Sequence, residues 1–166
     1  MSVAHISVLL EEVADNLASV TGSLFVDATV GGGGHSSVIL ERNPGLNVVG
    51  LDVDEDNLKK AEERLRGFSG RVTLIRGNFR NLKALLKGAD IDSFDSILFD
   101  LGLSTFQLAG TRGFSFNDDS FLDMRMDTRE SLTAYDVVNK YNYEALKRVI
   151  LEFGEEYRAA RIARAI

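Results

Sequence analysis

Apolar residues fall in four near-continuous runs within the first hundred positions, and amphipathic segments separate these runs. The runs cover residues 23–30, 47–54, 71–79 and 94–102, and β-branched and aromatic residues enrich them, which is typical of strands. Because the runs are continuous rather than alternating, both faces of each predicted strand should be buried. The pattern predicts an α/β fold, with a parallel sheet and helices on both faces.

The segments between and before these runs carry apolar residues at helical spacing. They predict helices over residues 6–17, 36–42, 55–68 and 81–88. In the third of these, Leu58, Ala61, Leu65 and Phe68 share one face, and acidic residues occupy the first turn, where the helix dipole favours them.

The pattern changes after residue 102. Residues 103–131 are rich in Gly, Asp, Asn, Ser and Thr and predict an irregular segment, and three helical segments then follow at 133–141, 143–153 and 156–166. We therefore predict two regions, an α/β body over residues 1–105 and an irregular segment with helices over residues 106–166.

Composition and charge narrow the class of protein. The 166 residues are 45% hydrophobic and 27% charged, as in an ordinary globular domain, and no apolar run is long enough to cross a bilayer. The absence of cysteine excludes disulfides and thiolate metal sites and fits a reducing compartment, so we expect a cytoplasmic protein with no membrane partner. Residues 1–111 hold 10 basic and 15 acidic residues, whereas residues 112–166 hold 9 and 10. Any nucleic-acid contact is therefore expected in the second region.

A glycine-rich stretch, "FVDATVGGGGHSS", follows the first predicted strand. A strand, a glycine turn and a helix start form the usual nucleotide-cofactor site of an open α/β sheet. Ser36 stands where a dinucleotide fingerprint counted from Gly31 would have its last glycine, and no lysine follows as a P-loop requires. S-adenosylmethionine (SAM), which has no pyrophosphate, is the third reading and the one favoured here.

Residues at the ends of the other predicted strands support SAM. Asp52 ends the second strand and suits a ribose diol, Phe79 follows the third and could stack on adenine, and Asp100 ends the fourth. Phe79 is equally well explained as a core residue from its chemistry alone. Four successive strand ends with suitable chemistry predict a SAM-dependent methyltransferase.

The chain resembles a known family along almost its whole length. The stretches "VDATVGGGGHSSVILE", "GLDVDEDNLKKAEERL", "RGFSF", "LDMRMD" and "FGEEYRAARIARAI" are similar to the bacterial ribosomal RNA small-subunit methyltransferase H family. The resemblance implies a Rossmann-like SAM-dependent enzyme that methylates the exocyclic N4 amine of a cytidine in small-subunit (16S) ribosomal RNA. Its partner would be that RNA or the assembled small subunit.

The resemblance also implies the site residues. It places cofactor contacts at Gly33, Gly34, His35, Asp52, Phe79, Asp100 and Gln107, gives Asp100 and Gln107 the catalytic roles beside the target amine, and requires no metal. His35 is expected to contribute through its backbone and by orienting the turn.

The sequence departs from the family pattern in three respects. Thr105 and Phe106 replace a Ser-Pro pair, and Ala109-Gly110-Thr111 stands where an acidic pair commonly precedes "RGFSF". The resemblance also implies a chain about twice as long, with a C-terminal part that completes the sheet. A SAM-binding module without catalysis is therefore the alternative function, whereas the lack of a hydride-handling site disfavours a nicotinamide-dependent oxidoreductase. The fourth strand would lie at an open edge, so we also expect pairing with another copy in a homodimer, cover by the chain's own helices, or poor stability.

Overall fold

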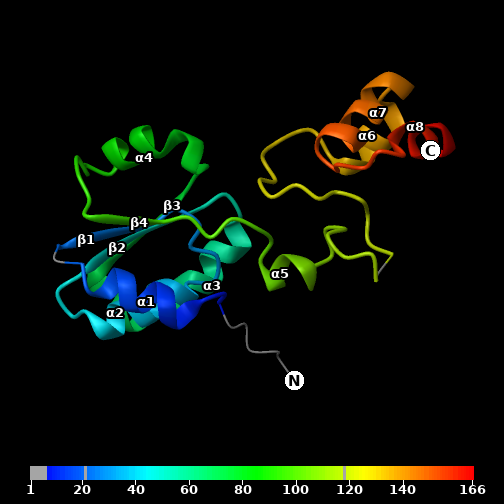
Figure 1. Ribbon diagram of the computed structural model, residues 1–166. Helices are drawn as coiled ribbons and strands as arrows, with labels where there is room; N and C mark the ends of the chain where they lie inside the picture. The colour runs from blue at the N-terminus through cyan, green and yellow to red at the C-terminus, as the bar shows by residue number, and fades with distance from the viewer. Residues whose placement is uncertain (1–6, 21, 118) are drawn as a thin grey trace. The chain divides into compact units, whose positions relative to one another are not determined.

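The computed structural model describes residues 7–20, 22–117 and 119–166 (Figure 1). The chain divides into two compact units, Met1–Thr105 and Phe106–Ile166.

A four-stranded parallel sheet forms the centre of the first unit. Its strands are β1 (Leu24–Asp27), β2 (Asn47–Asp52), β3 (Val72–Arg76) and β4 (Ser96–Leu98). The order across the sheet is β3-β2-β1-β4, and Val26 of β1 pairs with Val49 on one side and Ile97 on the other. The strand order reverses between β1 and β4, which is where open α/β sheets bind ligands.

Helices cover both faces of this sheet. Figure 1 shows α4 on one side and α1, α2 and α3 on the other, with bounds Leu10–Ala18 (α1), Gly34–Arg42 (α2), Glu55–Leu65 (α3) and Leu82–Gly88 (α4). Neighbouring strand residues point to opposite faces, so Phe25 packs with α1, α2 and α3, while Val26 packs with Leu86 of α4. The predicted α/β fold is confirmed.

The strands are shorter than the apolar runs that predicted them. Each run continues past the strand into the following loop, where Val30 is still buried although it lies outside β1. The third predicted helix ends at Leu65 and continues as the 3₁₀ segment η1 (Arg66–Arg71), and a second 3₁₀ segment, η2 (Phe79–Asn81), precedes α4. The first predicted helix begins at Leu10, and its residue Ile6 lies outside the described residues.

The edge strand β4 pairs only with β1 among the described residues, as predicted. Its outer backbone is therefore open, and apolar side chains around it are exposed, including Phe94, Phe99 and Leu101, the last at 70%. Exposed strand edges of this kind are normally protected in folded proteins.

The second unit is helical. It contains α5 (Thr105–Leu108, which begins at the boundary), α6 (Ala134–Lys140), α7 (Tyr143–Glu152) and α8 (Ala159–Ala165). A reciprocal capping box between Thr133 and Asp136 starts α6, and Asn142 caps α7. Its buried apolar residues are few: Leu146, Ala159 and Ala163.

The segment before α6 is held by Arg125. This guanidinium binds the Asp123 carboxylate and donates to the carbonyls of Thr128 and Glu130. Asp127 binds the Arg129 guanidinium, through Oδ1 to Nε at 2.8 Å and through Oδ2 to Nη2 at 2.7 Å.

No helix in the described part of the chain is both long and apolar enough to cross a bilayer.

Candidate cofactor site

The turn between β1 and α2 needs glycine for two different reasons. Gly31 and Gly33 have φ of 52° and 77°, in the left-handed region that other residues adopt only at a cost. A Cβ on Gly31 would meet nothing closer than the Thr29 carbonyl oxygen at 3.9 Å, an ordinary contact, whereas one on Gly33 would meet Leu65 at 3.2 Å. On Gly34 it would meet the Ser7 hydroxyl at 2.1 Å. Gly31 therefore borders the accessible side of the turn, and Gly33 and Gly34 are required by the packing of the chain itself.

His35 and the two glycines before it are buried. The His35 ring places Nε2 2.9 Å from the carbonyl oxygen of Val8 and Nδ1 3.9 Å from Oδ2 of Asp100. The ring is therefore engaged with the N-terminal segment, which agrees with an orienting role. Direct cofactor contact by Gly33, Gly34 and His35 stays a prediction.

Asp52 links the end of β2 to the glycine turn. Its Oδ2 accepts hydrogen bonds from the Gly31 amide at 3.0 Å and from the Asn57 side chain at 3.2 Å, and its Oδ1 accepts from the Asp54 amide at 2.8 Å. Burial raises the pKa of Asp52, and these hydrogen bonds oppose that rise. Each carboxylate oxygen can accept two hydrogen bonds, so Oδ1 retains capacity for a ribose hydroxyl.

Asp54, not Asp52, caps α3. Its side chain accepts a hydrogen bond from the Asp56 amide at 3.1 Å, so Asp52 is not needed as the cap of this helix. The sequence analysis did not identify Asn57. Its side chain reaches Asp52 because of the direction in which the first turn of α3 points it, and the sequence alone does not give that direction.

Two aromatic rings are in contact although they follow the two outer strands of the sheet. Phe79, after β3, and Phe99, after β4, pack edge to face with centroids 5.5 Å apart. Phe79 is 39% exposed and Phe99 45% exposed, so neither is a simple core residue. Phe79 thus presents an accessible ring of the kind that stacks on adenine, and Phe99 is an aromatic neighbour that the sequence analysis did not include.

Asp100 lies across the switch point from the glycine turn. Its amide donates to the Thr29 hydroxyl at 2.7 Å, which ties the loop after β4 to the loop after β1. Its side chain is 46% exposed and has room to accept a ligand donor. Thr29 is a further supporting residue that the sequence analysis missed.

Asp27, the last residue of β1, was also missed as a site residue. It is 1% exposed and accepts hydrogen bonds from the Ser36 hydroxyl at 2.7 Å and the Thr29 amide at 3.3 Å. Burial raises the pKa of Asp27 to about 6, against the lowering effect of the Ser36 hydrogen bond. The sequence signal was an acid that closes an apolar run directly before the glycines.

Gln107 belongs to the second unit, where its side chain is buried. Its predicted place beside the cofactor and target amine stays a prediction. In the same unit the Arg112 guanidinium lies 5.6 Å from the centroid of the Phe114 ring, and Phe116 is almost fully exposed.

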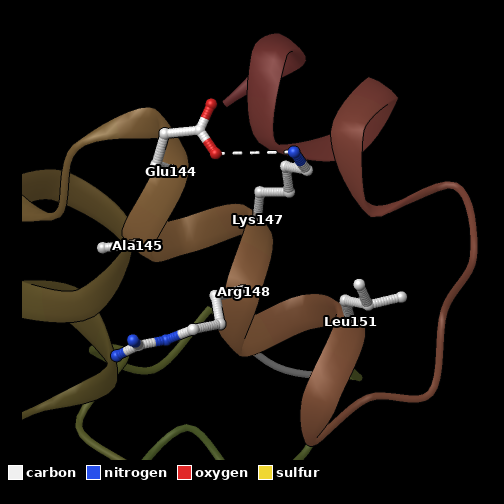
Figure 2. A pocket seen from close by; sticks show the side chains of 5 residues that line it. All are labelled: Glu144, Ala145, Lys147, Arg148 and Leu151. Atoms are coloured by element: carbon white, nitrogen blue, oxygen red, sulfur yellow. Dashed lines mark hydrogen bonds and ion pairs between the residues drawn. The ribbon is translucent and has the colours of Figure 1, made fainter.

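A hollow of about 450 Å³ lies on α7, away from these strand ends in the sequence. It is lined by Glu144, Ala145, Lys147, Arg148 and Leu151, and Figure 2 shows their side chains projecting from this one helix, with Lys147 paired to Glu144 at 3.4 Å. One helix face supplies no glycine turn, free carboxylate or accessible ring for a nucleoside. The hollow is therefore not the candidate cofactor site.

The donor set at the strand ends fits SAM. Gly31 leaves room beside its Cα, Asp52 keeps acceptor capacity for a ribose, Phe79 exposes a ring, and Asp100 offers an accessible carboxylate. Within residues 7–20, 22–117 and 119–166, no three His, Cys, Asp or Glu side chains are grouped to hold a metal ion.

Comparisons with known proteins agree with this reading. A family model described as the MraW methylase family matches residues 2–166. The ribosomal RNA small subunit methyltransferase H of Sulfurihydrogenibium sp. (strain YO3AOP1) is 50% identical over 164 residues, which are 99% of this chain and 56% of that protein. The protein of the same name from Syntrophotalea carbinolica is also 50% identical, over 98% of this chain and 52% of its own length.

The chain therefore spans about half the length of the curated relatives it matches. Among solved structures, an rRNA methylase from Streptococcus thermophilus is 27% identical, with a TM-score of 0.48, over 60% of this chain and 58% of its own.

Proposed function

Because the chain belongs to the MraW methylase family, we propose that it binds SAM at the carboxyl ends of its strands as part of a ribosomal RNA methyltransferase. The relatives' name supports methylation of small-subunit ribosomal RNA. The proposed target within that (16S) RNA is the exocyclic N4 amine of a cytidine. The observation that carries this proposal is that the glycine turn, Asp52, Phe79 and Asp100 all lie at or just after the carboxyl ends of strands in one parallel sheet.

Each residue has a stated task in this proposal. The Gly31 side of the turn receives the amino-acid part of the cofactor, Asp52 accepts hydrogen bonds from the ribose hydroxyls, and Phe79 stacks on the adenine. When bound, SAM supplies an electrophilic methyl group on a positively charged sulfur.

Asp100 acts on the target amine. The lone pair of a cytosine N4 amine is delocalised into the ring, so the amine is a weak nucleophile that has to be aligned with the methyl group. The accessible Asp100 carboxylate accepts a hydrogen bond from the amine, which orients its lone pair and stabilises the positive charge that develops on nitrogen. Gln107 holds the base or the cofactor, and a paired base is flipped out of its helix to reach the site.

The RNA partner is proposed to contact the second unit. The guanidinium groups of Arg158, Arg161 and Arg164 recur at a spacing of three on exposed positions, and among the described residues none forms an ion pair with the nearby glutamates. Such groups suit RNA phosphates. Action on ribosomal RNA would place the protein in the cytoplasm.

A SAM-binding module without methyl transfer is the second candidate function. It is favoured by one observation: the residues that suit SAM all lie in the first unit, whereas Gln107, the second proposed catalytic residue, belongs to the second unit.

Calorimetry with SAM, followed by transfer of a tritiated methyl group to small ribosomal subunits, tests both candidates. The proposal expects saturable binding of one SAM per chain and label in the 16S RNA. Binding without label selects the module, and the absence of binding contradicts both.

A further inference from the structure

Asp27 is the least exposed carboxylate among the described residues, and it lies directly under the glycine turn. It ends β1, is 1% exposed, and contacts the turn on both sides, at the Thr29 amide and at Ser36 in the first turn of α2. The charged or titratable groups that act on it are His35 from α2, which favours its ionised form, and Asp100 after β4, which disfavours that form.

The hydrogen bonds of Asp27 do not by themselves require a carboxylate. An asparagine has nearly the same volume, and it could accept from the Thr29 amide through its oxygen and donate to the Ser36 hydroxyl through its nitrogen. The neutral amide would also avoid the cost of burying a charge. The negative charge is therefore the feature of Asp27 that local packing leaves unexplained, and perturbed buried charges of this kind concentrate at functional sites.

We propose that Asp27 is a specificity-determining residue, whose buried negative charge favours SAM over its demethylated product, S-adenosylhomocysteine. This inference rests on the proposed function. The two ligands differ by the methyl group and by the positive charge on sulfur, so a nearby negative charge stabilises the first more than the second. Asp100 also carries a carboxylate, but at 46% exposure water and salt screen it, whereas the buried charge of Asp27 is screened much less.

Calorimetric titration of the whole chain with each ligand at pH 8 tests the proposal. Asp27→Asn should lower the preference for SAM, measured as the ratio of the two dissociation constants, on the order of tenfold. Binding of S-adenosylhomocysteine should change by no more than about twofold, because a neutral sulfur gains little from the charge.

Asp95→Asn is the matched control. Asp95 likewise accepts two backbone hydrogen bonds, from the amides of Ser23 and Leu24, but it lies at the amino end of β1, away from the turn. Its substitution should leave the ratio of dissociation constants unchanged.

Proton release on ligand binding supplies a second readout, which would not differ between the two ligands if Asp27 had only a structural role. Near pH 6, SAM should displace protons from the wild-type chain, seen as a binding enthalpy that depends on the buffer's ionisation enthalpy, and S-adenosylhomocysteine should displace fewer. Ser36→Ala removes a hydrogen bond that lowers the pKa of Asp27, so it should move this proton release to higher pH.

The possible results distinguish failure of the Asp27 proposal from failure of the proposed function. Equal weakening of both ligands by Asp27→Asn, or equal proton release with both, overturns the inference and leaves the SAM site standing. Failure of the wild-type chain to bind either ligand contradicts the proposed function itself, and the inference with it. Should Asp27→Asn fail to fold, the proton release of the wild-type chain decides.

Discussion

At the scale of single residues, carboxylates stabilise the candidate site by accepting hydrogen bonds from backbone amides. Asp52 fixes the Gly31 amide and Asp27 fixes the Thr29 amide, so two acids from adjacent strands set the shape of one turn. Burial raises the pKa of both. Keeping these two acids ionised at neutral pH therefore lowers the free energy of unfolding, as expected for buried charges that take part in binding.

Asp52→Asn should weaken SAM binding about tenfold, because a neutral amide is a poorer acceptor for a ribose hydroxyl and holds the Gly31 amide less firmly. Asp56→Asn is the matched control, since Asp56 lies on the exposed side of the same helix start and pairs with Lys59. Calorimetry measures the SAM affinity of both variants, and equal affinities would contradict a role of Asp52 in SAM binding.

The pH dependence of stability should carry the signature of Asp27. Its pKa is raised from 3.8 to about 6 in the folded chain, so its contribution to stability is fully present below pH 4 and is lost as the pH rises through 6. The loss amounts to about 3 kcal/mol, from the size of the pKa shift. Urea unfolding should show that the free energy of unfolding of Asp27→Asn, relative to the wild type, is higher at pH 8 than at pH 4. A difference between the two proteins that is the same at both pH values would contradict this assignment.

At the scale of elements, the arrangement of strands and helices could be predicted, whereas the strand ends could not. Continuous apolar runs indicate strands buried on both faces, and Phe25 and Val26 do pack on opposite faces. Val30 and Phe99 extend the apolar runs but lie in loops, because a loop that packs under a turn or against another ring needs the same apolar residues as a strand. Apolar pattern alone does not separate the two cases.

The same limit explains which site residues could be found. Asp52, Phe79 and Asp100 stand where apolar runs end, so their place at the carboxyl ends of the strands was predictable. Asn57 and Thr29 act through contacts to other strand ends, which depend on helix phase and loop path.

The glycine turn should respond differently at two of its positions. Gly31→Ala and Gly33→Ala both place a side chain at positive φ, at a cost of about 1–2 kcal/mol. Gly33→Ala should lower the free energy of unfolding further, since its Cβ crowds Leu65, whereas Gly31→Ala should cause the larger loss of SAM affinity, since its Cβ fills the open space. Urea unfolding and calorimetry check the two effects, and the reverse ranking would place the ligand elsewhere.

At the scale of the whole molecule, the open edge of the sheet predicts self-association. Among the described residues β4 pairs on one side only, and its other side and exposed Leu101 offer backbone groups and apolar surface to a second copy, so the chain should form a homodimer through this edge. Leu101→Lys should shift sedimentation equilibrium toward the monomer, and Leu132→Lys, an exposed leucine of the second unit, should not. Equal association of wild type and Leu101→Lys would argue against pairing at this edge.

The central claim is that SAM binds at the carboxyl ends of the strands, and amide NMR during a SAM titration tests it most directly. The account predicts saturable shifts at Gly31, Asp52, Phe79 and Asp100, which lie in four separate stretches of sequence but in one region of the first unit. Shifts confined to the hollow on α7, or a spectrum that SAM leaves unchanged, would contradict it.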